Sequence, residues 1–310
     1  MNERVIVCEV GPRDGLQMAN GRMATATKIR WIEALAAAGL PEIEVGSFVP
    51  ARVIPQMADT GEVVRAVRDL PALIVALAPN LKGAQLAAEA GAKRISVPVS
   101  VSEGHSRANT NRTTAEAVAE VGRIAAWVRD SGCGLQVEGA LSTAFGCSID
   151  GVVPERRVVE VAVALLGAGA DFVALADTVG YAHPAQIRSV VRAVRTAVGE
   201  GRLEGLHLHD TMGLGLANAL AGLDEGIRSF DSSLAGLGGC PYAPGASGNI
   251  VTEDLVFMLE SMGLSTGVDL EKLLEARAIL AEGLPDEPRH GGLARAGIPR
   301  TFKAAAQVTA

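Results

Sequence analysis

The chain contains 310 residues and carries a formal net charge of −7 at pH 7, with a hydrophobic fraction of 48%. Lysine and arginine form no basic run, so neither a nucleic acid nor an anionic membrane surface is expected as a partner. Every apolar run is interrupted by charges or glycines before the roughly 20 residues that a membrane span requires, which favours a soluble protein that acts on a small molecule.

Short runs rich in valine, isoleucine and leucine alternate with segments of helical period as far as about Gly263. These runs predict eight strands, at residues 5–10, 42–49, 73–78, 94–99, 135–141, 172–177, 206–210 and 229–233. Helical segments such as 25–38 and 114–130 separate the strands. Eight successive strand–helix units more naturally close into a barrel than form a doubly wound sheet. The predicted fold class is therefore α/β, a (β/α)8 TIM barrel with a C-terminal helical extension.

The C-terminal part of the chain is expected to extend this barrel rather than to form a second domain. No linker rich in glycine, serine or proline divides the sequence. We therefore expect one catalytic domain over residues 1–310, with a barrel core over about 1–265. In the extension, 266–310, a helix at 270–282 precedes a polar tail. An alanine-rich helical surface makes a homodimer the expected oligomeric state.

The cysteines and the N-terminus point to a reducing, cytoplasmic location. The first ten residues lack the apolar core of a signal peptide. Four cysteines are far apart and form no C-x-x-C pair: Cys8, Cys133, Cys147 and Cys240. The glycines spell no nucleotide-binding motif, because Gly236-x-Gly238 lacks the third glycine of G-x-G-x-x-G and no P-loop is present. Neither NAD nor ATP is therefore expected.

Polar residues gather where the predicted strands end, and this face carries the active site in a TIM barrel. The first strand is followed by Arg13 and Asp14, and the second carries Glu44 and Ser47. The sixth strand ends in Asp177. Because the ends of these strands meet around the barrel mouth, we expect the polar side chains to converge there.

The strongest single feature is the pair His207 and His209 in the seventh predicted strand. Residues i and i+2 of a strand project from the same face, so both imidazoles can reach one ion. The alternative is one exposed histidine and one hydrogen-bonded core histidine. A metal is favoured because the chain has only five histidines, and because oxygens of Asp14, Asp177 and Asn249 lie at other predicted mouth positions. This mixed set suits Mg, Mn, Fe or Zn.

Two further features suit chemistry beside a metal. Arg13 can stabilise a developing enolate oxygen while Asp14 ligates the ion, although a local ion pair that closes a turn is the alternative. The glycine-rich loop 236–249 is long enough to act as a mobile lid. It carries Cys240, which is either incidental or a proton donor near the metal.

Taken together, these motifs resemble those of the 3-hydroxy-3-methylglutaryl-CoA lyases. This family belongs to the metal-dependent barrel group that also holds the isopropylmalate, homocitrate and citramalate synthases. The resemblance spans nearly the whole chain and rests on segments 9–17 (EVGPRDGLQ), 43–49 (IEVGSFV), 79–83 (PNLKG), 207–211 (HLHDT), and 235–242 (AGLGGCPY) with 248–249 (GN). Motifs of this length rarely coincide by chance.

The resemblance implies a retro-Claisen cleavage of a 3-hydroxy-3-methylglutaryl-CoA-type thioester into acetyl-CoA and a keto acid, acetoacetate. It implies that Mg²⁺ or Mn²⁺ is bound by Asp14, His207, His209 and Asn249. The implied catalytic residues are Arg13 for the enolate, Cys240 as the acid, and Asp14, Glu44 and His207. The implied substrate-binding residues are Arg13, Gln17, Ser47, Asp177 and Glu253. The base that takes the hydroxyl proton is left open among Asp14, Glu44 and a histidine.

Two departures from the family pattern bear on the acyl group. Family members usually read RGYVSC on the fifth strand, where this chain has EGALST at 138–143. Before the sixth-strand aspartate, ALA at 174–176 replaces SLG. The alternatives are therefore a lyase for citramalyl-CoA or for a bulkier 3-substituted glutaryl-CoA, which Ala140 favours, or a Claisen-condensing synthase. A non-catalytic metal-binding barrel is the alternative from another class.

Overall fold

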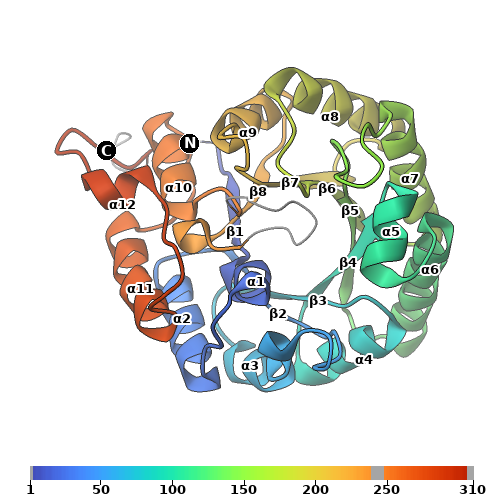
Figure 1. The fold of residues 1–310 in the computed structure, drawn as a ribbon, viewed down its shortest axis with the longest axis horizontal. Coiled ribbons are helices and arrows are strands. Elements are labelled where there is room, and N and C mark those ends of the chain that lie inside the picture. The colour runs from blue at the N-terminus through green and yellow to red at the C-terminus, as the bar shows by residue number, and fades with distance from the viewer. Residues whose placement is uncertain (1–2, 239–247, 306–310) are drawn as a thin grey trace.

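Eight parallel strands hydrogen-bond in sequence order and close into a barrel, because the first strand pairs with both the second and the eighth. The computed structural model describes residues 3–238 and 248–305 of the chain. Helices form a ring outside the strands (Figure 1). The predicted (β/α)8 TIM barrel is therefore confirmed.

Every predicted strand corresponds to one strand of this barrel. The strands are β1 (Ile6–Glu9), β2 (Glu42–Ser47), β3 (Leu73–Leu77), β4 (Arg94–Ser100), β5 (Gln136–Ser142), β6 (Phe172–Asp177), β7 (Leu203–Leu208) and β8 (Ser229–Ser232). The helices of the ring are α2 (Thr25–Ala37), α3 (Thr60–Val67), α4 (Leu81–Ala90), α6 (Thr114–Ser131), α7 (Glu155–Ala168), α8 (Pro184–Val198), α9 (Gly215–Asp224) and α10 (Thr252–Ser261). Two short helices, α1 (Leu16–Met18) and α5 (Glu103–Thr110), follow β1 and β4.

Alternation along each strand separates the core from the barrel interior, and β5 shows the principle. Val137 and Leu141 are buried and face the surrounding helices. Glu138 and Ala140 are partly accessible and line the interior. The period of two thus gives one strand an apolar outer face and a chemically different inner face.

Three strand ends differ from the sequence prediction by two or three residues, namely the end of β2 and both ends of β7. β2 ends at Ser47 rather than at residue 49, because the Thr60 hydroxyl is hydrogen-bonded to both the N–H and the carbonyl of Ser47. β7 begins at Leu203 rather than at residue 206. The sequence pattern missed this start because the second residue of β7, Glu204, is charged, and a charged residue does not predict a buried strand. Glu204 is accommodated there by its ion pair with Arg94.

The C-terminal extension packs on the side of the barrel beside α2 (Figure 1). Its main helix, α11 (Leu270–Gly283), matches the predicted helix and is capped by Asp269, whose carboxylate accepts two backbone N–H groups. The expected polar tail contains a further short helix, α12 (Gly292–Ala296), which the sequence did not predict. The Asp254 carboxylate holds the start of α12. Among the described residues, no helix has both the length and the apolarity needed to cross a bilayer.

Candidate active site

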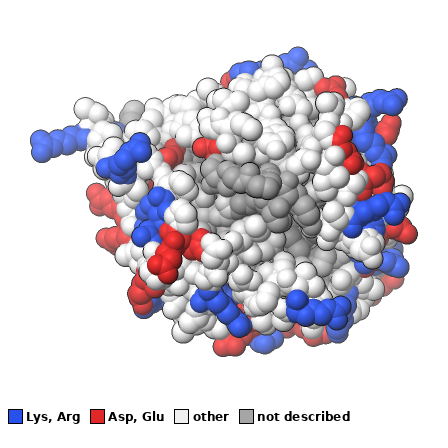
Figure 2. All heavy atoms as spheres, viewed as in Figure 1, with Lys and Arg blue, Asp and Glu red and all other residues white. Residues whose placement is uncertain are grey.

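A pocket of about 580 Å³ opens at the C-terminal ends of the strands, and each of the eight strands or the loop after it contributes to its wall. Helix α5 lies at the mouth and contributes His105 and Asn109 to the lining. On the face shown in Figure 2, the charged side chains are distributed around the outer ring with both signs interspersed. Inside the mouth, the pocket is lined by the charged side chains of Arg13, Asp14 and Glu44.

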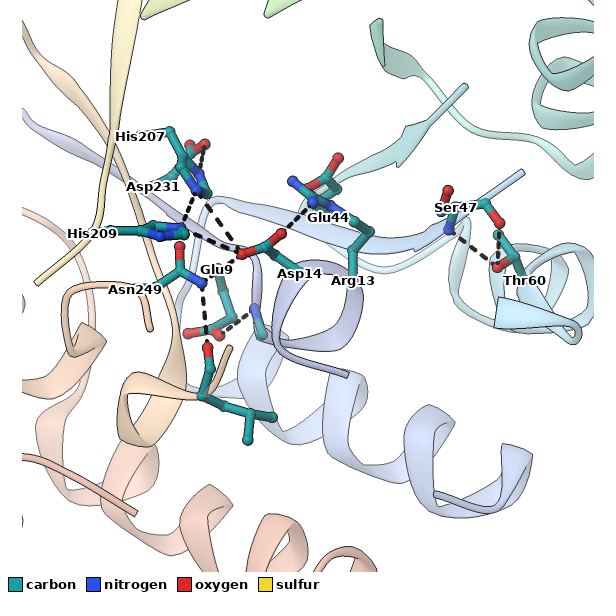
Figure 3. A network of polar contacts seen from close by, with 12 residues as sticks. Glu9, Arg13, Asp14, Glu44, Ser47, Thr60, His207, His209, Asp231 and Asn249 are labelled. Atoms are coloured by element: carbon teal, nitrogen blue, oxygen red, sulfur yellow. Dashed lines mark hydrogen bonds and ion pairs between the residues drawn. The ribbon is translucent and has the colours of Figure 1, made fainter. Parts of the chain in front are cut away.

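Three predicted ligands converge in this pocket. One ligand atom each of Asp14, His207 and His209 lies within 4.8 Å of the other two. The Nε2 atoms of His207 and His209 are 3.0 Å apart, and Asp14 Oδ2 lies 3.7 Å from His209 Nε2 (Figure 3). Two nitrogens and one carboxylate oxygen thus face a common point.

The spacing and chemistry of these atoms fit a divalent cation. Two nitrogens held at right angles about 2.1 Å from one ion lie about 3.0 Å apart, since the distance is √2 times the bond length. Asn249 Nδ2 donates to Asp14 Oδ2 at 2.7 Å, which places the amide beside the three ligands. Asn249 Oδ1 is buried and has no hydrogen-bond partner among the described residues. A buried acceptor of this kind is free to bind a cation or a water molecule. The structure therefore contains a candidate divalent-metal site.

Asp14 is positioned by a tight turn directly after β1. Residues Gly11–Gly15 form one π-helical turn, in which the Asp14 N–H donates to the carbonyl of Val10 at 2.7 Å. The buried carboxyl of Glu9 holds this turn from below, because Oε1 accepts the N–H groups of Gly11 and Leu234 at 2.9 and 2.8 Å. Glu9 Oε2 accepts a hydrogen bond from the Thr252 hydroxyl. One carboxyl group thus ties three segments of the barrel mouth together.

Asn249 reaches the site because its segment pairs with the end of β7. His209 and Asn249 form an antiparallel bridge, and Asp210 donates its N–H to the carbonyl of Gly248 at 3.0 Å. Gly238 makes room for the amide: its φ is +112°, and a Cβ there would lie 2.8 Å from Asn249 Nδ2. A side chain at position 238 would therefore push Asn249 away from Asp14.

The ring of His207 is oriented by Asp231, a residue that the sequence analysis did not select. His207 Nδ1 lies 3.0 Å from Asp231 Oδ2, which leaves Nε2 facing His209. The two residues are register partners in the β7–β8 ladder. A carboxylate that holds the second nitrogen of a metal-binding histidine fixes its tautomer and orientation. The available signal was an acidic residue in the middle of the eighth predicted strand.

Arg13 joins two carboxylates at the edge of the metal site. Its Nη1 lies 2.5 Å from Asp14 Oδ1, and its Nε lies 2.5 Å from Glu44 Oε2. Burial alone would lower the pKa of Arg13, but the charges of Glu44 and Asp14 outweigh burial and raise this pKa above its ordinary value. The guanidinium is therefore a permanent cation in the pocket. The alternative was a local ion pair between Arg13 and Asp14 that only closes a turn. Arg13 also contacts Glu44 on β2, so the pair is not purely local.

The same charges separate the pKa values of the acidic and imidazole groups. Burial would raise the pKa of Asp14, but Arg13 and the histidines hold it well below its usual range. Burial raises the pKa of Glu44 despite Arg13. Burial lowers the pKa of His209, whereas in His207 the hydrogen bond to Asp231 overcomes burial and raises the pKa. Asp14 is thus ionised and His209 is neutral, as metal ligation requires, whereas the raised pKa of His207 means that a cation would compete with a proton there.

The remaining predicted site residues lie in different places. Gln17 lines the pocket with Arg13 and Glu44. Ser47, Asp177 and Glu253 are buried and are absent from the described lining.

These three side chains have structural surroundings of their own. The backbone of Ser47 is bound by the hydroxyl of Thr60. The carboxylate of Asp177 accepts the backbone N–H groups of Tyr181 and Ala182 at 3.0 and 3.1 Å. Glu253 pairs with Arg277 and holds Ala235. Cys240 lies outside the described residues.

Several polar residues line the pocket that sequence reasoning did not select. Around the mouth these are Arg52, Asn80, His105, Asn109, Asn111 and Arg112, and in the interior they are Glu42, Ser96, Glu138 and Asp231. The amides at 109 and 111 fall within a polar helix end, which offers no local pattern for a binding site. Glu42 and Glu138 could have been selected from the sequence, because each is a charged residue at an alternate position of an otherwise apolar strand.

The buried Glu9 predicts a measurable pH effect on stability. Burial raises the pKa of Glu9 from 4.5 to about 8, so the folded protein holds a proton that the unfolded chain releases between these values. In that window the free energy of unfolding falls as pH rises, by up to about 1.4 kcal/mol per pH unit. Glu9→Gln is expected to flatten this slope, because the amide does not titrate. Urea unfolding at pH 5.5 and 7.5 measures the change in the free energy of unfolding between these two pH values.

The exposed Glu33 on α2 provides a matched control for this comparison. Glu33→Gln is expected to keep the pH slope of the unmodified protein. An equal slope in Glu9→Gln and the unmodified protein would show that Glu9 does not hold the proton.

Comparison with known proteins places this site in a family. The sequence model described as HMGL-like matches residues 4–280. This chain belongs to the HMGL-like family. It is 41% identical over 283 residues to the mitochondrial hydroxymethylglutaryl-CoA lyase of Gallus gallus, which covers 91% of this chain and 94% of that protein. It is 42% identical over 285 residues to the (R)-citramalyl-CoA lyase of Chloroflexus aurantiacus, which covers 88% and 89%.

A solved structure of an HMG-CoA lyase from Acinetobacter baumannii, in complex with coenzyme A and 3-methylmalate, has the same architecture. Its TM-score is 0.90 at 40% sequence identity, and the match covers 97% of each chain. Membership of the HMGL-like family, together with lyase relatives of this similarity, makes the protein a carbon–carbon lyase. The resemblance inferred from the sequence motifs is confirmed.

Proposed function

We propose that this protein cleaves a 3-hydroxy-3-methylglutaryl-CoA-type thioester to acetyl-CoA and a keto acid, which is acetoacetate for the methyl compound. The observation that carries the proposal is the convergence of Asp14, His207 and His209 beside the Arg13 guanidinium. A hydroxyl and a neighbouring oxygen of the substrate would be held there. The open pocket around these groups is large enough for the acyl part of a thioester.

The proposed metal ligands are Asp14, His207, His209 and Asn249, with Mg²⁺ or Mn²⁺ as the ion. Such an ion, when bound, lowers the pKa of a coordinated hydroxyl group and polarises oxygen atoms. Asp231 supports this arrangement from outside, because it fixes the ring of His207. Arg13 supports it from the other side, because it holds the free oxygen of Asp14.

The reaction requires a base for the tertiary hydroxyl proton, and Asp14, Glu44 and a histidine are the candidates. The low pKa of Asp14 makes it the weakest proton acceptor of the three. As the C2–C3 bond breaks, the C3–O group becomes the ketone of the leaving keto acid. The electron pair of that bond forms the enolate of acetyl-CoA, whose developing negative charge the permanent cation Arg13 would stabilise.

The enolate then needs a proton at carbon, and we propose Cys240 as its donor. A thiol can serve as a general acid near a metal site. The support for this role is the segment AGLGGCPY at 235–242, one of the motifs on which the resemblance to the lyase family rests. Gly238, the last described residue of that segment before Cys240, lies against Asn249 and Asp14.

The test is cleavage of 3-hydroxy-3-methylglutaryl-CoA by the purified protein with Mg²⁺ or Mn²⁺. Acetyl-CoA and acetoacetate are expected in equal amounts, and EDTA is expected to abolish their release until the cation is restored. Both products are measured by chromatography. Full activity in EDTA would contradict the metal-dependent mechanism.

A second candidate substrate is (R)-citramalyl-CoA, because a relative with this activity in its name is as similar as the hydroxymethylglutaryl-CoA lyases. The same assay distinguishes the two substrates, since cleavage of citramalyl-CoA releases pyruvate in place of acetoacetate.

We also propose a reducing compartment, the cytoplasm, for this reaction. The described cysteines Cys8, Cys133 and Cys147 are free thiols, which supports this location.

A further inference from the structure

The pocket continues below the metal site into the interior of the barrel. On β5 it is lined by the alternate residues Ser142, Ala140 and Glu138. A strand rises about 3.3 Å per residue, so the pocket follows β5 for about 13 Å over these four steps. His207 lies beside Ala176 in the β6–β7 ladder, whereas Ala174, one inward position deeper, lies beside Ala140. The pocket is therefore deeper than the metal site.

Small side chains form much of the wall of this deep part, although Pro98 on β4 lies beside Ala140. Ser96 on β4, Ala140 on β5, and Ala174 and Ala176 on β6 all line it. In TIM barrels the interior layers are usually filled by valine, isoleucine and leucine, which leave no such space. The absence of bulk at these positions leaves room beside the reacting carbon.

Carboxyl groups form the floor of the deep part, and most of them have partners. Glu42 is bound by Arg94 at 2.9 Å, and Asp231 is bound by His207. Glu138 differs from these two. Within residues 3–238 and 248–305, no hydrogen bond or ion pair is formed by its side chain.

The surroundings of Glu138 determine its charge and its capacity to bind. Burial, together with the charges of Asp231 and Glu42, raises the pKa of Glu138 well above its usual value. The group is then a neutral carboxylic acid, which can donate one hydrogen bond and accept another. Arg94, the described guanidinium at this level, is already paired with Glu42 and Glu204. An anionic tail would therefore meet acidic groups without a cation to balance it.

We propose that the deep part of the pocket binds the C3 substituent of the acyl group, and that this substituent is an uncharged chain, longer than methyl, with a terminal hydroxyl or amide facing Glu138. The step from Ala140 to Glu138 is about 6.6 Å, which a chain of about four carbon atoms spans. This inference rests on the proposed function, because the same metal site and Arg13 cleave the C2–C3 bond. It narrows the substrate class to 3-hydroxyglutaryl-CoA thioesters with a long neutral branch.

The experiment compares thioesters that differ only in the C3 substituent: methyl, butyl, 4-hydroxybutyl and 3-carboxypropyl. With Mg²⁺ present, kcat/KM for the 4-hydroxybutyl compound is expected to exceed that for the methyl compound by about tenfold or more. The butyl compound should fall between them, because it leaves Glu138 without a partner. The carboxypropyl compound should be the poorest of the four.

Variants separate the size of the pocket from its polar floor. Ala140→Leu fills the deep part, so the ratio of kcat/KM for 4-hydroxybutyl to methyl is expected to fall by about 100-fold. Ala140→Val, a smaller change, should move the ratio in the same direction if the leucine variant does not fold. Glu138→Leu should remove the preference for 4-hydroxybutyl over butyl, while Glu138→Gln should retain most of it.

The outcomes distinguish this inference from the proposed function. Cleavage of the methyl compound alone, or an unchanged ratio in folded Ala140→Leu, overturns the inference and leaves the proposed function in place. Cleavage of none of the four compounds overturns both.

Discussion

Replacing His207 with alanine is expected to lower kcat/KM by about 10³-fold or more. His207 Nε2 lies 3.0 Å from His209 Nε2 and faces the common point of the three ligands, so its loss removes one of the two nitrogen donors. The loss of several kcal/mol of charge stabilisation corresponds to this fall in rate, at about 1.36 kcal/mol per tenfold change. Steady-state kinetics with saturating Mn²⁺ measures it.

Metal content gives this prediction a readout that does not depend on turnover. At equal cation concentration, dialysed His207→Ala is expected to retain less than about one tenth of the Mn²⁺ bound by the unmodified protein. Asp231 does not face the cation and only orients the ring of His207. Asp231→Asn is therefore expected to lower the affinity for Mn²⁺ by about 10–100-fold.

The exposed His183 at the start of α8 serves as the matched control for His207. His183→Ala is expected to keep both the metal content and the activity. Equal metal binding by His207→Ala and the unmodified protein would rule out His207 as a ligand.

Replacing Arg13 with lysine is expected to lower kcat by about 10²–10³-fold with a much smaller change in KM. Arg13 uses Nε and Nη1 for Glu44 and Asp14, and a single ammonium does not reproduce this fork. The interaction lost is one aimed at the charge that develops on the enolate oxygen, and removal of one such donor has an effect of this size. A large rise in KM with kcat unchanged would instead assign Arg13 to ground-state binding.

Arg94→Lys is the matched control for Arg13→Lys. Arg94 also joins two carboxylates, Glu42 and Glu204, but it lies at the start of β4, away from the metal ligands. Both variants are expected to reduce thermal stability, because each disturbs a buried ion-pair network. Only Arg13→Lys should lose kcat by two orders of magnitude. A similar loss in both variants would show that destabilisation, rather than transition-state binding, explains the effect.

The local pattern of the sequence determined the fold class and the central features of the site. Alternation of apolar runs with helical segments was sufficient for eight strands, because each run has to bury both its faces in a closed parallel barrel. His207 and His209 could be assigned to one face because side chains alternate along a strand regardless of what surrounds them. Arg13 and Asp14 could be placed at the mouth because they follow the first strand directly.

Tertiary structure alone decided which distant residues meet these groups. The pairing of β7 with β8 brings Asp231 to His207, a contact that depends on the register between these two strands. The packing of α11 against α10 leaves Glu253 paired with Arg277 rather than in the pocket.

The deep part of the pocket likewise depends on packing. Ala140 and Ala174 could be recognised in the sequence as small, but the space beside them exists only because neighbouring strands also carry small inward residues. Spacing along a chain determines the direction of a side chain, whereas the space and the partners it meets come from elements remote in sequence. The metal site was therefore largely predictable from the sequence, and the acid-floored pocket beneath it was not.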